Sequence, residues 1–240
     1  MPIKVVTFDF WGTLYRNTVS LKHGRKDRIR AAFDRCGITH ISDEQIYKAM
    51  ENSWLLWDDI WRKEQRTLPV AEFLGLVFGE LKIQLPDWVI DELCHSLQEA
   101  VFTGNTVPTD HIVEVVAELS RSYKLGIISD TGVSSGKYLG RLIERDHPGK
   151  FSFGLYSDEL GMSKPAPGVF QKVLDINGCK ADEVVHVGDL KHTDVLGAKQ
   201  AGMYSVRYSG VRDDIGEGFP EADWVITDYR DLTEIIRGIR

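Results

Sequence analysis

Cysteines are scarce in this 240-residue sequence, and the three that are present exclude some classes of protein. Cys36, Cys94 and Cys179 are odd in number and lack the paired spacing of a metal site. We therefore expect reduced thiols in a cytoplasmic protein. A chain of this length buries enough core to fold without disulfides or a structural metal.

Long apolar runs and an excess of positive charge are also missing. The first apolar stretch is too short for a signal peptide, and no stretch reaches the roughly 20 residues that span a bilayer. Acidic residues outnumber basic ones by 36 to 29, which gives a net charge of −7. We therefore expect no membrane association and no general binding of nucleic acid.

Two patterns alternate along most of the chain. Segments with apolar residues at helical spacing, such as 110–123, separate short runs rich in β-branched residues. This alternation predicts an α/β fold: a three-layer α/β/α core whose sheet is mostly parallel. In such folds, ligands bind beyond the carboxyl ends of the strands. The predicted strands are residues 3–9, 124–130, 151–158, 183–189, 203–209 and 223–228.

Residues 16–103 break this alternation, because they have several helical patterns and no convincing strand. We predict that they form a small all-helical domain over the strand ends, while residues 1–15 and 104–240 form the core. Trp54, Trp57 and Trp61 lie on one helical face, which indicates packing within this domain, with a pocket lining as the alternative. The basic run at 22–30 is interpreted as a solvated helix face, or as a surface that recruits an anion.

Asp9 ends the first predicted strand and precedes Gly12 and Thr13. Glycine allows a tight turn, and backbone N–H groups in such a turn can bind an anion. Asp9 is therefore a candidate nucleophile or metal ligand, with helix or turn capping as the alternative.

Ser129 ends the second predicted strand and is followed by Asp130 and Thr131. A strand-end hydroxyl and turn amides suit the oxygens of a phosphoryl group. The alternative is that Ser129 caps a helix that begins near Val133.

Lys164 lies in a loop stiffened by prolines, where its charge can neutralise a phosphate or a carboxylate. Asp189 and Asp194 flank a strand-to-helix turn, and clustered carboxylates suit Mg²⁺, although capping would also explain Asp194. His186, within the preceding strand, is interpreted as a packed core histidine.

Four segments resemble the motifs of a known family in their amino-acid sequence and in their order, and this resemblance covers nearly the whole chain. The chain resembles the haloacid dehalogenase superfamily, in the subfamily with a helical cap after the first strand. Its counterparts of the four superfamily motifs are FDFWGTL, IISDTG, SKPAPGVF and VHVGDLKHTDVLGAKQAGM. The resemblance implies a hydrolase in which Asp9 is the nucleophile and forms a covalent aspartyl intermediate. It also implies that Ser129 hydrogen-bonds the transferring group and that Lys164 offsets negative charge.

The same resemblance implies Mg²⁺ as the cofactor and a small anionic substrate. The ion would be held by Asp9, the main-chain carbonyl of Trp11 and Asp189, with Asp194 close by. Arg16, just behind the first motif, is a candidate clamp for a substrate carboxylate or phosphate. The sequence is compatible with a monomer or a homodimer.

Trp11 departs from the family pattern, because family phosphatases carry an aspartate there as proton donor and acceptor. Indole only donates, so the site needs a good leaving group or a surrogate such as His192. Family dehalogenases carry an aromatic residue at this position, but those that work without metal lack the acidic pattern of Asp189 and Asp194. Three hypotheses follow: a Mg²⁺-dependent phosphohydrolase, a dehalogenase-like hydrolase, and a catalytically weakened protein that binds a phosphorylated ligand or a partner.

Overall fold

The computed structural model describes residues 2–239, and its centre is a six-stranded sheet in the order β5-β4-β1-β6-β7-β8. Every neighbouring pair in this sheet is parallel. All six predicted strands are confirmed, with ends shifted by one or two residues in most of them. They are β1 (Val5–Phe8), β4 (Lys124–Ser129), β5 (Phe151–Tyr156), β6 (Val184–Gly188), β7 (Tyr204–Tyr208) and β8 (Trp224–Ile226).

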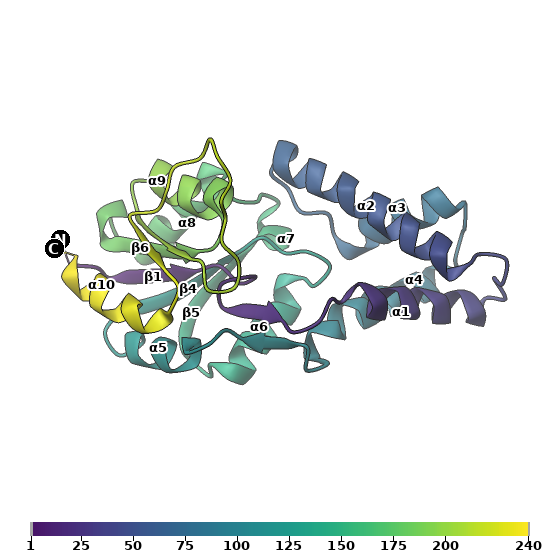
Figure 1. Cartoon of the computed structure of the whole chain (residues 1–240), viewed down its shortest axis with the longest axis horizontal. Helices are drawn as coiled ribbons and strands as arrows, with labels where there is room; N and C mark the ends of the chain where they lie inside the picture. Colours follow the sequence, from purple (N-terminus) through teal and green to yellow (C-terminus); the bar gives the residue numbers. More distant parts are fainter. Residues whose placement is uncertain (1, 240) are drawn as a thin grey trace.

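Helices cover both faces of the sheet, so the predicted three-layer architecture is confirmed (Figure 1). On β1, Val6 and Phe8 pack into one hydrophobic cluster, whereas Val5 packs into the other, as the alternation of a strand dictates. The first cluster includes α5 (Ile112–Leu119), α6 (Gly136–Asp146) and α10 (Leu232–Gly238), and the second includes α8 (Pro167–Asn177) and α9 (Leu196–Gln200).

Short helical elements complete the connections between strands. They are α7 (Ser157–Leu160), the 3₁₀ turns η1 (Glu99–Phe102), η2 (Ala181–Glu183) and η4 (Tyr229–Asp231), and the π-helical turn η3 (Lys191–Val195). Within residues 2–239, no helix combines the length and the apolarity needed to cross a bilayer.

Four helices between β1 and β4 form a lobe that lies away from the chain termini (Figure 1). They bury a hydrophobic cluster that includes Phe33, Ile46 and Leu74, and Val133 of the core joins it. This cluster is separate from the two that flank the sheet, and the bounds of the helical domain stay a prediction. The helices are α1 (Lys22–Arg35), α2 (Asp43–Glu64), α3 (Val70–Leu81) and α4 (Asp87–Gln98).

The prediction that residues 16–103 contain no strand is wrong for residues 16 and 17. β2 (Tyr15–Asn17) pairs in antiparallel fashion with β3 (Thr106–Pro108), so the chain enters and leaves the four-helix lobe through a two-stranded ribbon. Three residues are too few to show a strand periodicity, and their partners lie far away in the chain. The sequence therefore carries no local signal for this pair.

Candidate active site

A cavity of about 370 Å³ lies at the carboxyl ends of the central strands, where the core meets the four-helix lobe. The core contributes Asp9, Trp11, Asp130, Lys164, Asp189 and Asp194 to its walls, among others. Trp54, Trp57 and Trp61 of α2 line it as well, and Trp54 also packs against the hydrophobic cluster of the lobe. Both interpretations of these tryptophans therefore hold in part.

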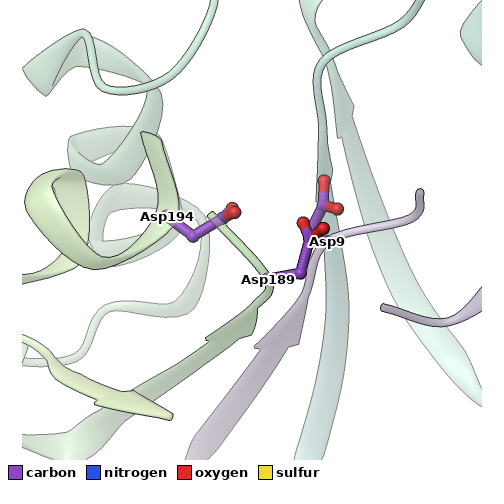
Figure 2. A group of neighbouring side chains, drawn as sticks. All are labelled: Asp9, Asp189 and Asp194. Atoms are coloured by element: carbon purple, nitrogen blue, oxygen red, sulfur yellow. The ribbon is translucent and has the colours of Figure 1, made fainter. Parts of the chain in front are cut away.

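Three buried aspartates form what we call the carboxylate cluster: Asp9, Asp189 and Asp194 (Figure 2). One carboxylate oxygen from each lies within 4.8 Å of the others. Asp9 and Asp189 directly follow β1 and β6, which are neighbours in the sheet. Asp194 projects toward them from η3 (Figure 2), so parallel pairing and one helical turn assemble the cluster.

Lys164 is the buried cation of this site, with an exposed side-chain fraction of only 2%. Its Nζ donates to Asp9 Oδ1 and to Asp194 Oδ1, at 2.6 Å in each case, and to the carbonyl of Ile128 at 3.1 Å. Burial lowers the pKa of Lys164, but the carboxylates of Asp194 and Asp9 outweigh that effect and raise it above its usual value. The ammonium therefore stays charged.

Asp194 is held by four donors and is ionised. Its Oδ1 accepts from Lys164 and from His186 Nε2 at 3.1 Å, and its Oδ2 accepts from the Leu190 N–H at 3.0 Å and from the Thr193 hydroxyl. Burial acts to raise the pKa of Asp194, but Lys164 and His186 hold it below its usual value. His186 is buried, as predicted for a core histidine, and it also supports this carboxylate.

The other two carboxylates carry negative charge that their surroundings do not fully balance. Burial raises the pKa of Asp189 to about 6, although Arg212 Nη2 lies 2.6 Å from its Oδ2. Burial, reinforced by Asp194 and Asp189, raises the pKa of Asp9 in spite of Lys164. An oxygen-only donor set with excess negative charge fits a divalent cation such as Mg²⁺. Arg212 was not predicted, because it lies in a loop without a motif.

Gly12 has a steric role that differs from the predicted one. Its N–H donates to the Tyr15 carbonyl at 2.8 Å, so this amide is not free to bind an anion. Its φ is +78°, and a Cβ at this position would overlap the Asp189 carboxylate. Thr13, next to it, is buried and does not line the cavity.

We expect Gly12→Ala to displace Asp189 and to lower both activity and stability. The positive φ alone costs roughly 1–2 kcal/mol for a residue with a Cβ, and the overlap adds to this cost. The free energy of unfolding and the hydrolysis rate measure the two effects. Gly37→Ala is the matched control, because Gly37 has a φ of +70° and an added Cβ there would contact nothing within 4 Å. Equal losses of activity in both variants would contradict this role.

The last residue of β4 and the two residues that follow it have different surroundings. The Ser129 hydroxyl is buried and has no partner among the described residues. Its alternative role as a helix cap is wrong, since α6 begins at Gly136 with Ser135 at the cap position. Thr131 does not line the cavity, and its N–H donates to the Ser157 hydroxyl at 2.8 Å.

Asp130 lines the cavity and links the core to the lobe. Its Oδ2 accepts from Trp61 Nε1 at 3.1 Å, and its Oδ1 accepts from the Lys164 N–H at 2.9 Å. Burial raises the pKa of Asp130 from 3.8 to about 6, against the effect of Lys164. The carboxylate is therefore charged at neutral pH and is the stronger acceptor for the indole in that form.

We expect the Trp61 indole N–H resonance to titrate with a midpoint near pH 6, because deprotonation of Asp130 strengthens this hydrogen bond. Between about pH 4 and 6 the folded state holds a proton that the unfolded state has lost, so this group's contribution to stability falls as the pH rises through that range. An NMR titration checks the midpoint. Asp130→Asn should remove the transition, and its persistence in this variant would assign it to another group.

Two of the remaining three predicted residues line the cavity, and the third lines a hollow beside it. Trp11 lines the cavity, as does His192, whose Nε2 is 3.3 Å from Arg62 Nη1. Burial and Arg62 lower the pKa of His192, so the imidazole is neutral at pH 7. Arg16 pairs with Asp110 at 3.1 Å and lines an adjoining hollow whose walls include Trp11 and Asp189. Its role as a clamp stays a prediction.

A parallel α/β core, strand-end carboxylates and a helical insertion after the first strand together define a class of hydrolases. Residues 6–208 match the model of the family described as haloacid dehalogenase-like hydrolase, and the chain belongs to this family. It is therefore a hydrolase of the haloacid dehalogenase superfamily, which confirms the resemblance of its four motifs.

The chain is similar to one phosphatase in sequence and to two solved structures in fold. The glyceraldehyde 3-phosphate phosphatase of Methanocaldococcus jannaschii is 30% identical over 246 residues, which cover 99% of each chain. A 2-haloacid dehalogenase from Pseudomonas syringae pv. Tomato aligns with a TM-score of 0.69 at 22% identity and covers 98% of both chains. A phosphatase from Thermococcus onnurineus aligns with a TM-score of 0.68 at 21% identity, covering 99% of this chain and 100% of that one. These two structures share its fold.

Proposed function

We propose that the protein is a Mg²⁺-dependent phosphohydrolase that acts on a small phosphorylated metabolite with a good leaving group. The carboxylate cluster carries this proposal, because its three buried carboxylates outnumber Lys164 and Arg212, the two cations that contact them, and leave negative charge for a divalent cation to balance. Metal-free dehalogenases of the superfamily lack the acidic pattern of Asp189 and Asp194. The phosphatase name of the relative with 30% identity supports the same assignment.

Asp9, Asp189 and the main-chain carbonyl of Trp11 would hold the ion, with Asp194 beside them. When bound, Mg²⁺ would stabilise negative charge on the phosphoryl oxygens. Lys164 would favour the ionised form of Asp9 and orient its carboxylate through the 2.6 Å contact to Oδ1. The same ammonium would offset charge that develops on the transferring group.

The second oxygen of Asp9 would attack phosphorus. A bond would form between this oxygen and phosphorus, while the bond from phosphorus to the leaving-group oxygen breaks and its electron pair leaves with that oxygen. The Ser129 hydroxyl, buried and without a partner, would donate to a phosphoryl oxygen. Water would then hydrolyse the aspartyl phosphate and restore Asp9.

Trp11 narrows this chemistry to leaving groups that depart without a proton. Acyl phosphates and phosphoanhydrides have such leaving groups, whereas an alkoxide needs a general acid that indole cannot replace. His192 is our candidate base for the second step, because it lines the cavity and burial keeps it neutral.

We further propose residues 16–103 as a cap and residues 1–15 and 104–240 as the catalytic core. The cap's hydrophobic cluster and the two-stranded ribbon at its base support this division. The tryptophans of α2 would exclude water from the cavity when the cap closes.

A dehalogenase-like reaction is the second candidate, and Trp11 favours it. An aromatic residue at this position lines the cavity, and a halide leaves without protonation. Asp9 would then attack carbon and form an ester that water hydrolyses.

A substrate panel, with and without Mg²⁺, separates the two candidates. It should contain acetyl phosphate, 4-nitrophenyl phosphate, glyceraldehyde 3-phosphate and 2-chloropropionate. We expect phosphate release from the first two that stops with EDTA, and slow release from glyceraldehyde 3-phosphate because its leaving group is an alkoxide. Chloride release that is insensitive to EDTA would overturn the phosphohydrolase and establish the second candidate.

A further inference from the structure

One cation of the basic run at 22–30 differs from the others, because its side chain has neither an acidic partner nor a hydrogen bond among the described residues. Lys22 pairs with Glu51, Lys26 and Arg30 pair with Asp43, and Arg28 donates to Ser96 and to the Gly24 carbonyl. Arg25 forms no ion pair and no side-chain hydrogen bond with any residue from 2 to 239, and its Nε is buried without a partner. The solvated-face interpretation therefore fails for this one residue.

Arg25 lines the same cavity as the carboxylate cluster. Its guanidinium lies over the Trp54 ring, 5.3 Å from the centroid. Burial and the nearby Arg28 lower the pKa of Arg25 to about 10, which leaves it protonated at neutral pH. The side chain is half-buried, and its Nε is buried without a partner. A partly desolvated guanidinium beside a single aromatic ring gains free energy when an anion joins it.

The other cations of the cavity wall are already engaged. Lys164 contacts Asp9 and Asp194, Arg212 contacts Asp189, and Arg62 contacts Asp58 at 2.7 Å. Among the described residues, Arg25 is thus the cation of the cavity wall whose charge is available to bind an anionic ligand.

We propose that Arg25 binds a carboxylate on the part of the substrate that is not transferred, so that the enzyme selects small phosphorylated carboxylic acids. This inference rests on the proposed function, in which the phosphoryl group occupies the cluster end of the cavity. The guanidinium forms two parallel hydrogen bonds with a carboxylate, whose single charge matches its own. A carboxylate is also smaller than a second phosphate, and a cavity of about 370 Å³ must hold the phosphoryl group as well. The tryptophans of α2 contact the apolar body between the two anionic groups.

Two aryl phosphates with nearly equal leaving groups test this assignment: 4-nitrophenyl phosphate and 3-carboxy-4-nitrophenyl phosphate. We expect the wild type to prefer the carboxylated compound. Arg25→Met, which keeps most of the side-chain volume, should lower kcat/KM for that compound by about 10- to 100-fold and leave the other within about 3-fold. Arg35→Met is the matched control, because Arg35 lies on the same helix and pairs with Glu92 away from the cavity. Arg25→Lys should restore part of the preference, and it replaces Arg25→Met if that variant does not fold.

A binding measurement separates this inference from the proposed chemistry. Calorimetric titration of Asp9→Asn with 3-carboxy-4-nitrophenyl phosphate needs no turnover. Binding that weakens about 10-fold or more with Arg25→Met supports the carboxylate site, even if the wild type hydrolyses neither compound. Equal affinity for both compounds in the Asp9→Asn protein, or equal loss of both with Arg25→Met, would overturn it.

Discussion

Replacing Asp9 by asparagine should abolish hydrolysis, with kcat lower by about 10⁴-fold or more for every substrate. Asparagine keeps the shape of the side chain and can still accept from Lys164, but its neutral amide cannot form the acyl phosphate. Phosphate release under single-turnover conditions measures the loss. Lys164 retains Asp194 as a partner at 2.6 Å, so we expect the variant to stay folded.

Asp158 provides the matched control for this result. It also follows a strand of the sheet, but its carboxylate accepts from the Gly136 N–H at 3.1 Å and does not line the cavity. Asp158→Asn should therefore keep near-normal activity. Residual activity of Asp9→Asn above one per cent of the wild type, or equal losses in both variants, would refute Asp9 as the nucleophile.

Replacing Trp11 by aspartate should raise the hydrolysis of alkyl phosphates by about 10²- to 10⁴-fold, which is the usual contribution of a positioned general acid and base. The new carboxyl group would lie in the cavity that Trp11 now lines. Acetyl phosphate, whose leaving group needs no proton, should gain much less. The ratio of kcat/KM for glyceraldehyde 3-phosphate to that for acetyl phosphate measures the change and cancels differences in the amount of folded protein.

Trp11→Asn is the control for this gain, because asparagine opens the same space and is polar but does not titrate. It should leave the ratio close to that of the wild type. If both variants gain equally, space and not proton transfer limits the reaction. If Trp11→Asp binds Mg²⁺ and gains nothing, the absence of a general acid at this position is not what limits alkyl phosphates.

Both predictions depend on the balance of charge around the carboxylate cluster. Lys164 and His186 keep Asp194 ionised, whereas burial raises the pKa of Asp9 and Asp189. A divalent cation would favour the ionised forms of all three groups, so it would also favour the nucleophilic form of Asp9. In the proposed mechanism, Mg²⁺ held by Asp9 and Asp189 would therefore supply positive charge both for the phosphoryl group and for the ionised form of the nucleophile.

The core and the cluster could be predicted from the sequence because their signals are local. Alternating strand and helix patterns identified all six strands of the sheet, and the strand-end positions of Asp9 and Asp189 followed from them. Parallel strands present their carboxyl ends at one edge, so residues 180 positions apart meet without any further information. Ser129 was predicted from its position at the end of a strand, and Lys164 was predicted from its place in a short motif with two prolines.

Other features depend on contacts between segments that carry no local pattern. The pairing of β2 with β3, the contact from Trp61 to Asp130 and the contact from Arg212 to Asp189 each join distant parts of the chain. Arg16 is nearer to the first motif than Arg25, yet Arg16 pairs with Asp110 outside the cavity and Arg25 lines it.

The sequence by itself thus determined the α/β core, the family and the carboxylates at the strand ends, because strand periodicity and short motifs are encoded in neighbouring residues. Only the tertiary structure decided which cations of the cavity wall have anionic partners and which one has none among the described residues. Whether a charge is paired depends on the side chains that surround it in space, and those come from helices and loops far away in the chain.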